Sequence, residues 1–121
     1  MQIFLSLQPL PKGIYGAACQ VPEKESYFVF IANEAGTQKQ RFAFGHELAH
    51  IFLDHFHSDD PITIDREKRI VFHNGKEIDP SMIDTATKSE KEANARAWEF
   101  YRKYKTAFIY LKEHGKAKIT E

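Results

Sequence analysis

The sequence predicts a small α+β domain in which a sheet of few strands packs on one helix, with a second, longer helix alongside. Two observations support this prediction. Segments of strand-like composition come before a helix-like segment, and a hairpin-like segment separates that helix from the longer one. Strands and helices that follow one another in runs, rather than in strict alternation, are typical of α+β folds and not of doubly wound parallel sheets.

Two strands are expected before the first helix. Residues 13–21 (GIYGAACQV) are apolar, and residues 26–33 (SYFVFIAN) combine aromatic and β-branched side chains between polar flanks. The strand over 26–33 is also a candidate for the edge of the sheet. An edge strand can bind an extended peptide through its free backbone groups.

The first helix is expected from Thr37 to about Phe56. Thr37 is a favourable N-cap residue, and Gln40 follows it at the spacing of a capping box. Gly45 lies inside this helix and costs about 1 kcal/mol relative to alanine. A glycine at that position indicates that the helix packs closely against another element, most simply the sheet.

A hairpin and a long helix are expected in the second half. Residues 68–78 (KRIVFHNGKEI) contain the Asn-Gly pair that two-residue type I′ turns favour. After a connector over residues 79–88, the second helix is expected from Ser89 to His114. Gly115 is a suitable residue to end it.

Composition narrows the functional classes. The 121 residues suffice for one domain, over residues 1–121, with its own core. Formal net charge is zero, which gives no reason to expect direct binding to nucleic acid. Cys19 is the only cysteine, so no intrachain disulfide is possible and a reducing compartment is indicated; we expect Cys19 to be a small core residue. With neither a signal peptide nor a membrane span apparent, a cytoplasmic protein is expected.

The segment RFAFGHELAHIFLDH (41–55) carries the strongest chemical signal. His46 and His50 are four residues apart, which on a helix places them on one face about 40° apart. Both imidazoles can then bind one tetrahedral zinc ion. Glu47 is rotated by about 100° from His46, beside such an ion, where it can act as a general base. This pattern predicts a catalytic zinc site.

A third protein ligand is expected from the second helix. Its apolar stripe, extended back by one turn, reaches Glu90, whereas Glu92 falls on the polar face. A carboxylate on a buried face needs a partner, and a metal held by the two histidines supplies one. Asn94, on the same stripe, is a candidate for orienting a ligating histidine, and Asp54 is a weaker one. The apolar positions of the stripe are Ala93, Ala97, Phe100, Tyr104, Phe108 and Leu111.

Other polar residues carry weaker signals. His57 shares the face of the motif histidines but lies about 16 Å along the helix axis from His46, so it is a poor ligand candidate. His57, His73 and Tyr101 are all candidates for stabilising an oxyanion, and none is favoured. The basic segment 102–105 (RKYK) is most simply a solvated helix face.

Taken together, RFAFGHELAHIFLDH, the later EKEAN (residues 90–94) and YFVFIAN before the motif resemble the ImmA/IrrE metallopeptidase family, across about residues 13–100. The resemblance implies a small zincin-like domain with the gluzincin arrangement of ligands. In that arrangement His46, His50 and Glu90 bind Zn²⁺ and Glu47 is the base. The chain lacks the Met-Pro pair that often follows the EAN segment in that family.

The resemblance also implies a function. Such proteins are zinc-dependent endopeptidases of bacteria, phages or mobile elements, and their usual substrate is a helix-turn-helix transcriptional repressor. A rival interpretation is a zinc-stabilised binding module without turnover, such as a partner in a toxin–antitoxin or repressor pair. A second rival is a metal-free protein in which both histidines are core residues. The oligomeric state is left open by the sequence.

Overall fold

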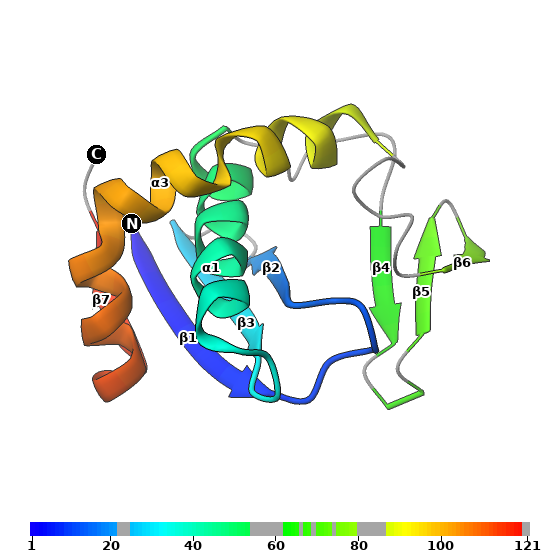
Figure 1. The fold of residues 1–121 in the computed structure, drawn as a ribbon, viewed down its shortest axis with the longest axis horizontal. Coiled ribbons are helices and arrows are strands. Elements are labelled where there is room, and N and C mark those ends of the chain that lie inside the picture. Colours follow the sequence, from blue (N-terminus) through cyan, green and yellow to red (C-terminus); the bar gives the residue numbers. More distant parts are fainter. Residues whose placement is uncertain are drawn as a thin grey trace.

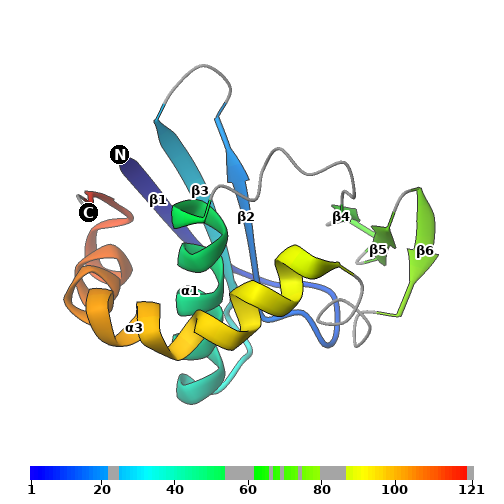
Figure 2. The same ribbon diagram turned by 90° about the horizontal axis from the view of Figure 1, so that it is seen from above.

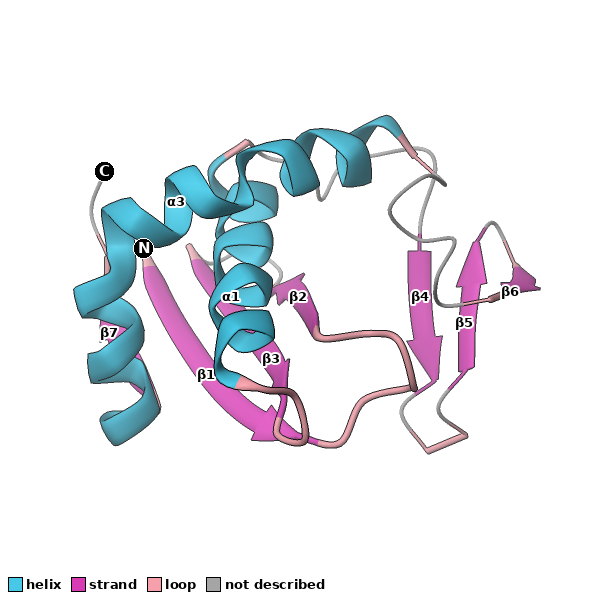
Figure 3. Cartoon of the chain, viewed as in Figure 1, coloured by secondary structure: helices cyan, strands magenta, loops and turns pink. Residues whose placement is uncertain are grey.

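The computed structural model describes residues 1–21, 25–53, 62–65, 67–68, 70–73, 75–79 and 87–119. The predicted α+β class is confirmed: a four-stranded sheet and a smaller three-stranded sheet accompany two helices that pack on each other (Figure 1; Figure 3). In chain order the elements are β1 (Gln2–Gln8), β2 (Gly16–Gln20), β3 (Ser26–Ala32), α1 (Thr37–Phe52), β4 (Ile62–Asp65), β5 (Ile70–His73), β6 (Lys76–Ile78), α3 (Lys88–His114) and β7 (Lys116–Lys118).

The larger sheet is mixed and has the strand order β2-β3-β1-β7. Strand β3 pairs in parallel with β1, whereas β2 and β7 are antiparallel to their neighbours. The expectation that the strand over 26–33 forms an edge is therefore wrong, because β3 lies between β2 and β1. The edges among the described strands are β2, which neighbours helix α1, and the short β7.

The two central strands follow the alternation expected of a sheet covered on one face. Ile3 and Leu5 of β1 are buried, as are Tyr27, Val29 and Ile31 of β3, and these residues join the main hydrophobic core. Successive side chains of a strand point to opposite faces, so these alternate residues share the face that the helices cover. Burial of this apolar face is what attaches the helices to the sheet.

The start of α1 differs from the predicted capping box. Gly36 is the N-cap residue, and no side-chain hydrogen bond caps the helix. Thr37 is the first helical residue instead. The side-chain amide of Gln40 donates a 3.0 Å hydrogen bond to the backbone carbonyl of Ala32, at the end of β3. It does not reach back to Thr37. A tertiary contact with the sheet thus replaces the local one.

Helix α1 ends at Phe52, earlier than the predicted end near residue 56, which lies outside the described residues. Along its length it packs on β2 and β3 and also on α3, which crosses it (Figure 2). Phe44 is completely buried and its ring stacks on Phe108 of α3, with the centroids 4.5 Å apart. Phe44 thus belongs to the main hydrophobic core.

Gly45 explains how closely the two helices approach. A Cβ atom on Gly45 would lie 1.9 Å from the backbone oxygen of Ala97 in α3. The close packing predicted from this glycine is confirmed, but its partner is α3 and not the sheet. Only hydrogen fits between the two backbones here, so Gly45 and the small Ala97 together fix where the helices cross.

Helix α3 confirms the predicted long helix. Gly115 ends it in a left-handed conformation with φ of 80°, and Tyr104 interrupts it with a non-helical φ of −119° that marks a kink. Beyond the kink the helix lies against β1 and β7, and β7 returns to pair with β1. Five stripe positions are buried as predicted: Ala93, Ala97, Phe100, Phe108 and Leu111.

The predicted hairpin over residues 68–78 is confirmed by the antiparallel strands β5 and β6, with Gly75 at a positive φ of 78° in the turn. Strand β4 adds to β5 and completes the smaller sheet. Val71 of β5 is buried in a second hydrophobic cluster with Leu10, Ile14 and Ala32. This cluster joins the small sheet to the loop that follows β1.

Several features were not predicted. The apolar start of the chain forms β1, and β4 and β7 were likewise missed. Cys19 is exposed rather than in the core. Within the described ranges, neither helix is apolar enough over a sufficient length to cross a membrane.

We predict that Gly45→Ala will lower the free energy of unfolding by about 3 kcal/mol or more, because the new methyl group meets backbone that cannot rotate away. Gly36→Ala is the matched control, since a Cβ there would have nothing within 4 Å; it should cost no more than about 1 kcal/mol. Urea denaturation of both variants measures the difference. Equal stability of the two variants would contradict the described helix crossing.

Candidate metal site

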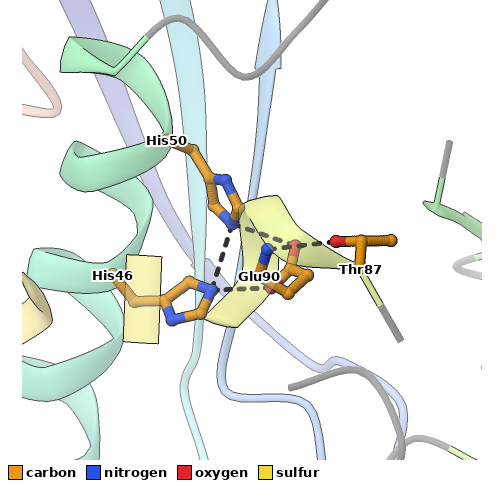
Figure 4. A network of polar contacts seen from close by, with 4 residues as sticks. All are labelled: His46, His50, Thr87 and Glu90. Atoms are coloured by element: carbon orange, nitrogen blue, oxygen red, sulfur yellow. Dashed lines mark hydrogen bonds and ion pairs between the residues drawn. The ribbon is translucent and has the colours of Figure 1, made fainter. Parts of the chain in front are cut away.

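Three side chains from two helices converge on one point (Figure 4). The Nε2 atom of His46 lies 2.8 Å from Oε2 of Glu90, and Nε2 of His50 lies 2.9 Å from Oε1 of the same carboxylate. The two Nε2 atoms are 3.1 Å apart. The sequence predicted these three residues as ligands, and the structure brings them together as a candidate metal site.

These contacts do not fit a set of ordinary hydrogen bonds. If both Nε2 atoms carry hydrogen and donate to Glu90, two N–H groups face each other at 3.1 Å with no lone pair between them. If only one carries hydrogen, the lone pair of the other faces the carboxylate at 2.8 or 2.9 Å. A cation among the two Nε2 atoms and the carboxylate oxygens removes the conflict, because each of these atoms can then direct a lone pair towards it.

The spacing also suits a zinc ion. Ligand bonds of about 2.0–2.1 Å in tetrahedral geometry place neighbouring ligand atoms about 3.3–3.4 Å apart. The observed separations of 2.8, 2.9 and 3.1 Å are close to this value and slightly shorter. Two histidines and one glutamate are a donor set found in catalytic zinc sites, where the fourth position is left for water or substrate. The residues present therefore fit the predicted metal.

Helix α1 positions the two histidines, and α3 positions the carboxylate. His46 and His50 are one turn apart, so their rings lie side by side with centroids 4.8 Å apart. His46 directly follows Gly45, the residue at the helix crossing. The contact that brings the helices together thus lies next to the first ligand.

Thr87 fixes the position of Glu90 within α3. It is the N-cap residue, and its Oγ1 accepts a 3.0 Å hydrogen bond from the backbone N–H of Glu90 (Figure 4). This role of Thr87 was not predicted, although the Thr-x-x-Glu spacing of a capping box indicates it. In an ordinary capping box the glutamate side chain turns back to the N-cap backbone, whereas Glu90 reaches across to α1.

The charge of Glu90 is strongly stabilised. Burial of its side chain raises the pKa, but the adjacent imidazoles of His46 and His50 lower it, and the net result is a pKa of about 2. Glu90 also lies in the first turn of α3, where the helix dipole favours a negative charge. The carboxyl group is therefore ionised at neutral pH, which is the form that binds a metal ion.

Glu47 lies between α1 and the edge strand β2. Its side chain is only 4% exposed, and its Cγ is 3.2 Å from where a Cβ on Gly16 would stand. That Cβ would also lie 3.1 Å from Cβ of Ala43. The absence of a side chain at Gly16 thus leaves the space that Glu47 occupies. The role of Glu47 as a base stays a prediction.

The other candidate residues that the structure describes are not among the three converging side chains. Glu92 is exposed, as its place on the polar face predicted. Asn94 makes no hydrogen bond to His46 or His50 in the described part of the chain, and its buried Oδ1 has no partner there, so the prediction that it orients a ligand is wrong for this structure. Tyr101 packs against Trp98 and Phe108, and its role in stabilising an oxyanion stays a prediction.

Three further candidates lie outside what the structure describes. These are Asp54, His57 and the side chain of His73. Their predicted roles stay predictions.

The chain matches no protein-family model, no curated protein and no solved structure. The candidate function therefore rests on the residues of the two-helix site, their geometry and the sequence motif that contains them.

We predict that Glu90→Gln will weaken zinc binding by more than roughly 100-fold, because an amide is a poor zinc ligand. Loss of a residue that only hydrogen-bonds to a ligand typically costs roughly 10–100-fold. Glu92→Gln is the matched control and should change stability and binding by no more than about 0.5 kcal/mol. Calorimetric zinc titration of both variants beside the wild type tests this. Loss of zinc binding in Glu92→Gln but not in Glu90→Gln would overturn the assignment.

Proposed function

We propose that this protein is a zinc-dependent endopeptidase that acts on a protein substrate. The observation that carries the proposal is the convergence of two Nε2 atoms and one carboxylate on a single point, with a glutamate next in sequence to the first histidine. This combination would provide three metal ligands and, in Glu47, a separate carboxylate that is not one of them. Hydrolysis of a peptide bond at neutral pH requires both.

The chemistry divides between the ion and the protein. Zinc bound at the site would act as a Lewis acid that polarises a carbonyl group and acidifies water. Glu47 would accept the proton of the attacking water on its carboxylate and later deliver it to the leaving amine. Burial of Glu47 against β2 holds the carboxylate near one position, which suits a group that must receive and return a proton at defined atoms.

Strand β2 is the element best placed to bind an extended substrate. It is an edge of the larger sheet, so one row of its backbone N–H and C=O groups has no strand partner among the described residues. A peptide that adds to this edge runs past Gly16, where β2 approaches Glu47. Docking by strand addition would therefore bring the backbone of a substrate close to the base. This replaces the expectation that the strand over 26–33 is the docking edge.

The resemblance of the sequence to ImmA/IrrE metallopeptidases supports a narrower version of the proposal. It implies that the substrate is a helix-turn-helix transcriptional repressor and that cleavage relieves repression. The arrangement of His46, His50 and Glu90 supports the ligand roles that the resemblance assigns. The rival interpretation, a zinc-stabilised binding module, keeps the same three ligands but does not need Glu47.

We predict that purified protein will hold close to one zinc ion per chain and that His46→Ala or His50→Ala will lose most of it. Binding should weaken at acidic pH, because protons then compete with the metal for the imidazole nitrogens. Elemental mass spectrometry after dialysis at several pH values measures both effects. Native protein that takes up no zinc even when the metal is supplied would contradict the proposal.

We predict that Glu47→Gln will bind zinc as the wild type does but will cleave a cognate repressor more slowly, by at least the roughly 10²–10⁴-fold effect of one general base. Glu113→Gln, an exposed carboxylate near the end of α3, is the control and should cleave at the wild-type rate. Gel-based cleavage assays with zinc-loaded proteins measure the rates. Equal rates for wild type and Glu47→Gln would exclude Glu47 as the base, and binding of the repressor without cleavage would favour the binding module.

A further inference from the structure

The candidate metal site occupies one end of a longer seam between α1 and α3. On each helix, three residues at four-residue spacing lie on the same face, about 40° apart in rotation. The two rows are Phe42, His46 and His50 on α1, and Glu90, Asn94 and Trp98 on α3. The rows meet at both ends, since the ligands converge at one end and two aromatic rings meet at the other.

The aromatic end is continuous with the metal site. The rings of Phe42 and Trp98 meet edge to face, with centroids 5.6 Å apart. The ring of Phe42 also lies 6.2 Å from that of His46. Phe42 is one helical turn from His46, about 6 Å along the axis, which is within the reach of a large side chain on a residue held at the metal.

This apolar end is open to solvent. Trp98 is 39% exposed, although a tryptophan buries more apolar area than any other side chain when it is covered. On its other side it meets Tyr101 edge to face, at 5.9 Å between centroids. An exposed aromatic surface beside a metal site is suited to bind a molecule that has both a metal-binding polar group and an apolar group.

The middle of the seam holds a polar group that lacks a partner. Oδ1 of Asn94 is buried and accepts no hydrogen bond within the described residues. A buried carbonyl oxygen of this kind destabilises the protein until a donor reaches it. Asn94 is one turn from Glu90 and one turn from Trp98, so a donor bound in the seam would lie between the metal and the aromatic rings.

From these features we propose that the seam is a specificity site that binds a large apolar side chain, aromatic or branched aliphatic, of the substrate residue next to the scissile bond. Phe42 and Trp98 contact the side chain, and Oδ1 of Asn94 accepts a hydrogen bond from a backbone N–H of the same peptide. The inference rests on the proposed function, since the metal site would anchor the peptide. It adds the class of residue that the site selects.

Trp98 is the only tryptophan of the chain, which makes its fluorescence a direct reporter of the seam. The probes are two small hydroxamates that bind zinc, identical except for a benzyl or a methyl group on the carbon next to the hydroxamate. With zinc-loaded wild-type protein, the benzyl probe should bind about tenfold more tightly than the methyl probe. Its binding should shift the Trp98 emission to shorter wavelength and protect Trp98 from quenching by acrylamide.

The variants identify the residues responsible. In Phe42→Ala the preference for benzyl over methyl should fall to about twofold or less, while the methyl probe binds as in the wild type. Trp98→Ala, measured by calorimetry, should give the same result. Tyr110→Ala is the control, an aromatic residue on α3 that is 50% exposed away from the seam, and it should keep the full preference. Circular dichroism shows whether each variant is folded.

A third probe tests Asn94. It is the benzyl hydroxamate extended by a secondary amide, compared with the matched ester, which lacks the N–H donor and should bind the wild type more weakly. The same replacement should have no effect on Asn94→Ala. An equal loss in both proteins would exclude Asn94 as the acceptor.

The outcomes separate this inference from the proposed function. Equal affinity for benzyl and methyl probes in zinc-loaded wild type, or a preference that persists in both Phe42→Ala and Trp98→Ala, overturns the seam as a specificity site even if repressors are cleaved. A preference that depends on Phe42 and Trp98, in a protein that cleaves no repressor, supports the seam as a site for an apolar side chain and counts against repressors as the substrate. Protein that takes up no zinc contradicts both the proposed function and the seam as a specificity site.

Discussion

The close approach of α1 and α3 at Gly45 and Ala97 determines how the two helices are placed relative to each other. A Cβ atom on Gly45 would lie 1.9 Å from the backbone oxygen of Ala97, so only glycine allows the helix axes to come this close. His46 follows Gly45 directly, and its ring meets the carboxylate of Glu90 from the other helix. A larger separation of the helices would move Glu90 away from the two histidines and break the convergence of the three side chains. Packing of two backbones therefore sets the geometry of the candidate metal site.

Helix α1 packs against both the larger sheet and α3. One side of α1 covers β2 and β3, and its other side contacts α3. Small residues allow both approaches: Gly45 towards α3, and Gly16 of β2 towards the helix. Through Gly16 the edge strand comes close to Glu47, and through Gly45 the third ligand comes close to the histidines. Different neighbours of α1 thus position the proposed base and the proposed ligands. A substitution at one contact can therefore change the base without changing the ligands, or the reverse.

The sequence predicted the candidate site better than it predicted the sheet, for physical reasons. Helical periodicity is local, so the spacing of His46 and His50 and the stripe that ends at Glu90 could be followed along each helix. Strand order is not local. Nothing near residues 26–33 indicates that β1 pairs with them, and the edge was therefore assigned to the wrong strand. Gln40 shows the same limit, because its side chain bonds to β3 rather than to its own helix end.

The proposed function requires that Nε2 of His46, Nε2 of His50 and the Glu90 carboxylate bind one zinc ion. Diffraction from crystals of zinc-loaded wild-type protein, recorded at the zinc absorption edge, locates the ion. We expect a single strong anomalous peak about 2.0–2.2 Å from Nε2 of His46, Nε2 of His50 and a carboxylate oxygen of Glu90. A zinc peak bound by other residues, or an ordered site in which these three side chains only bond to one another, would contradict it.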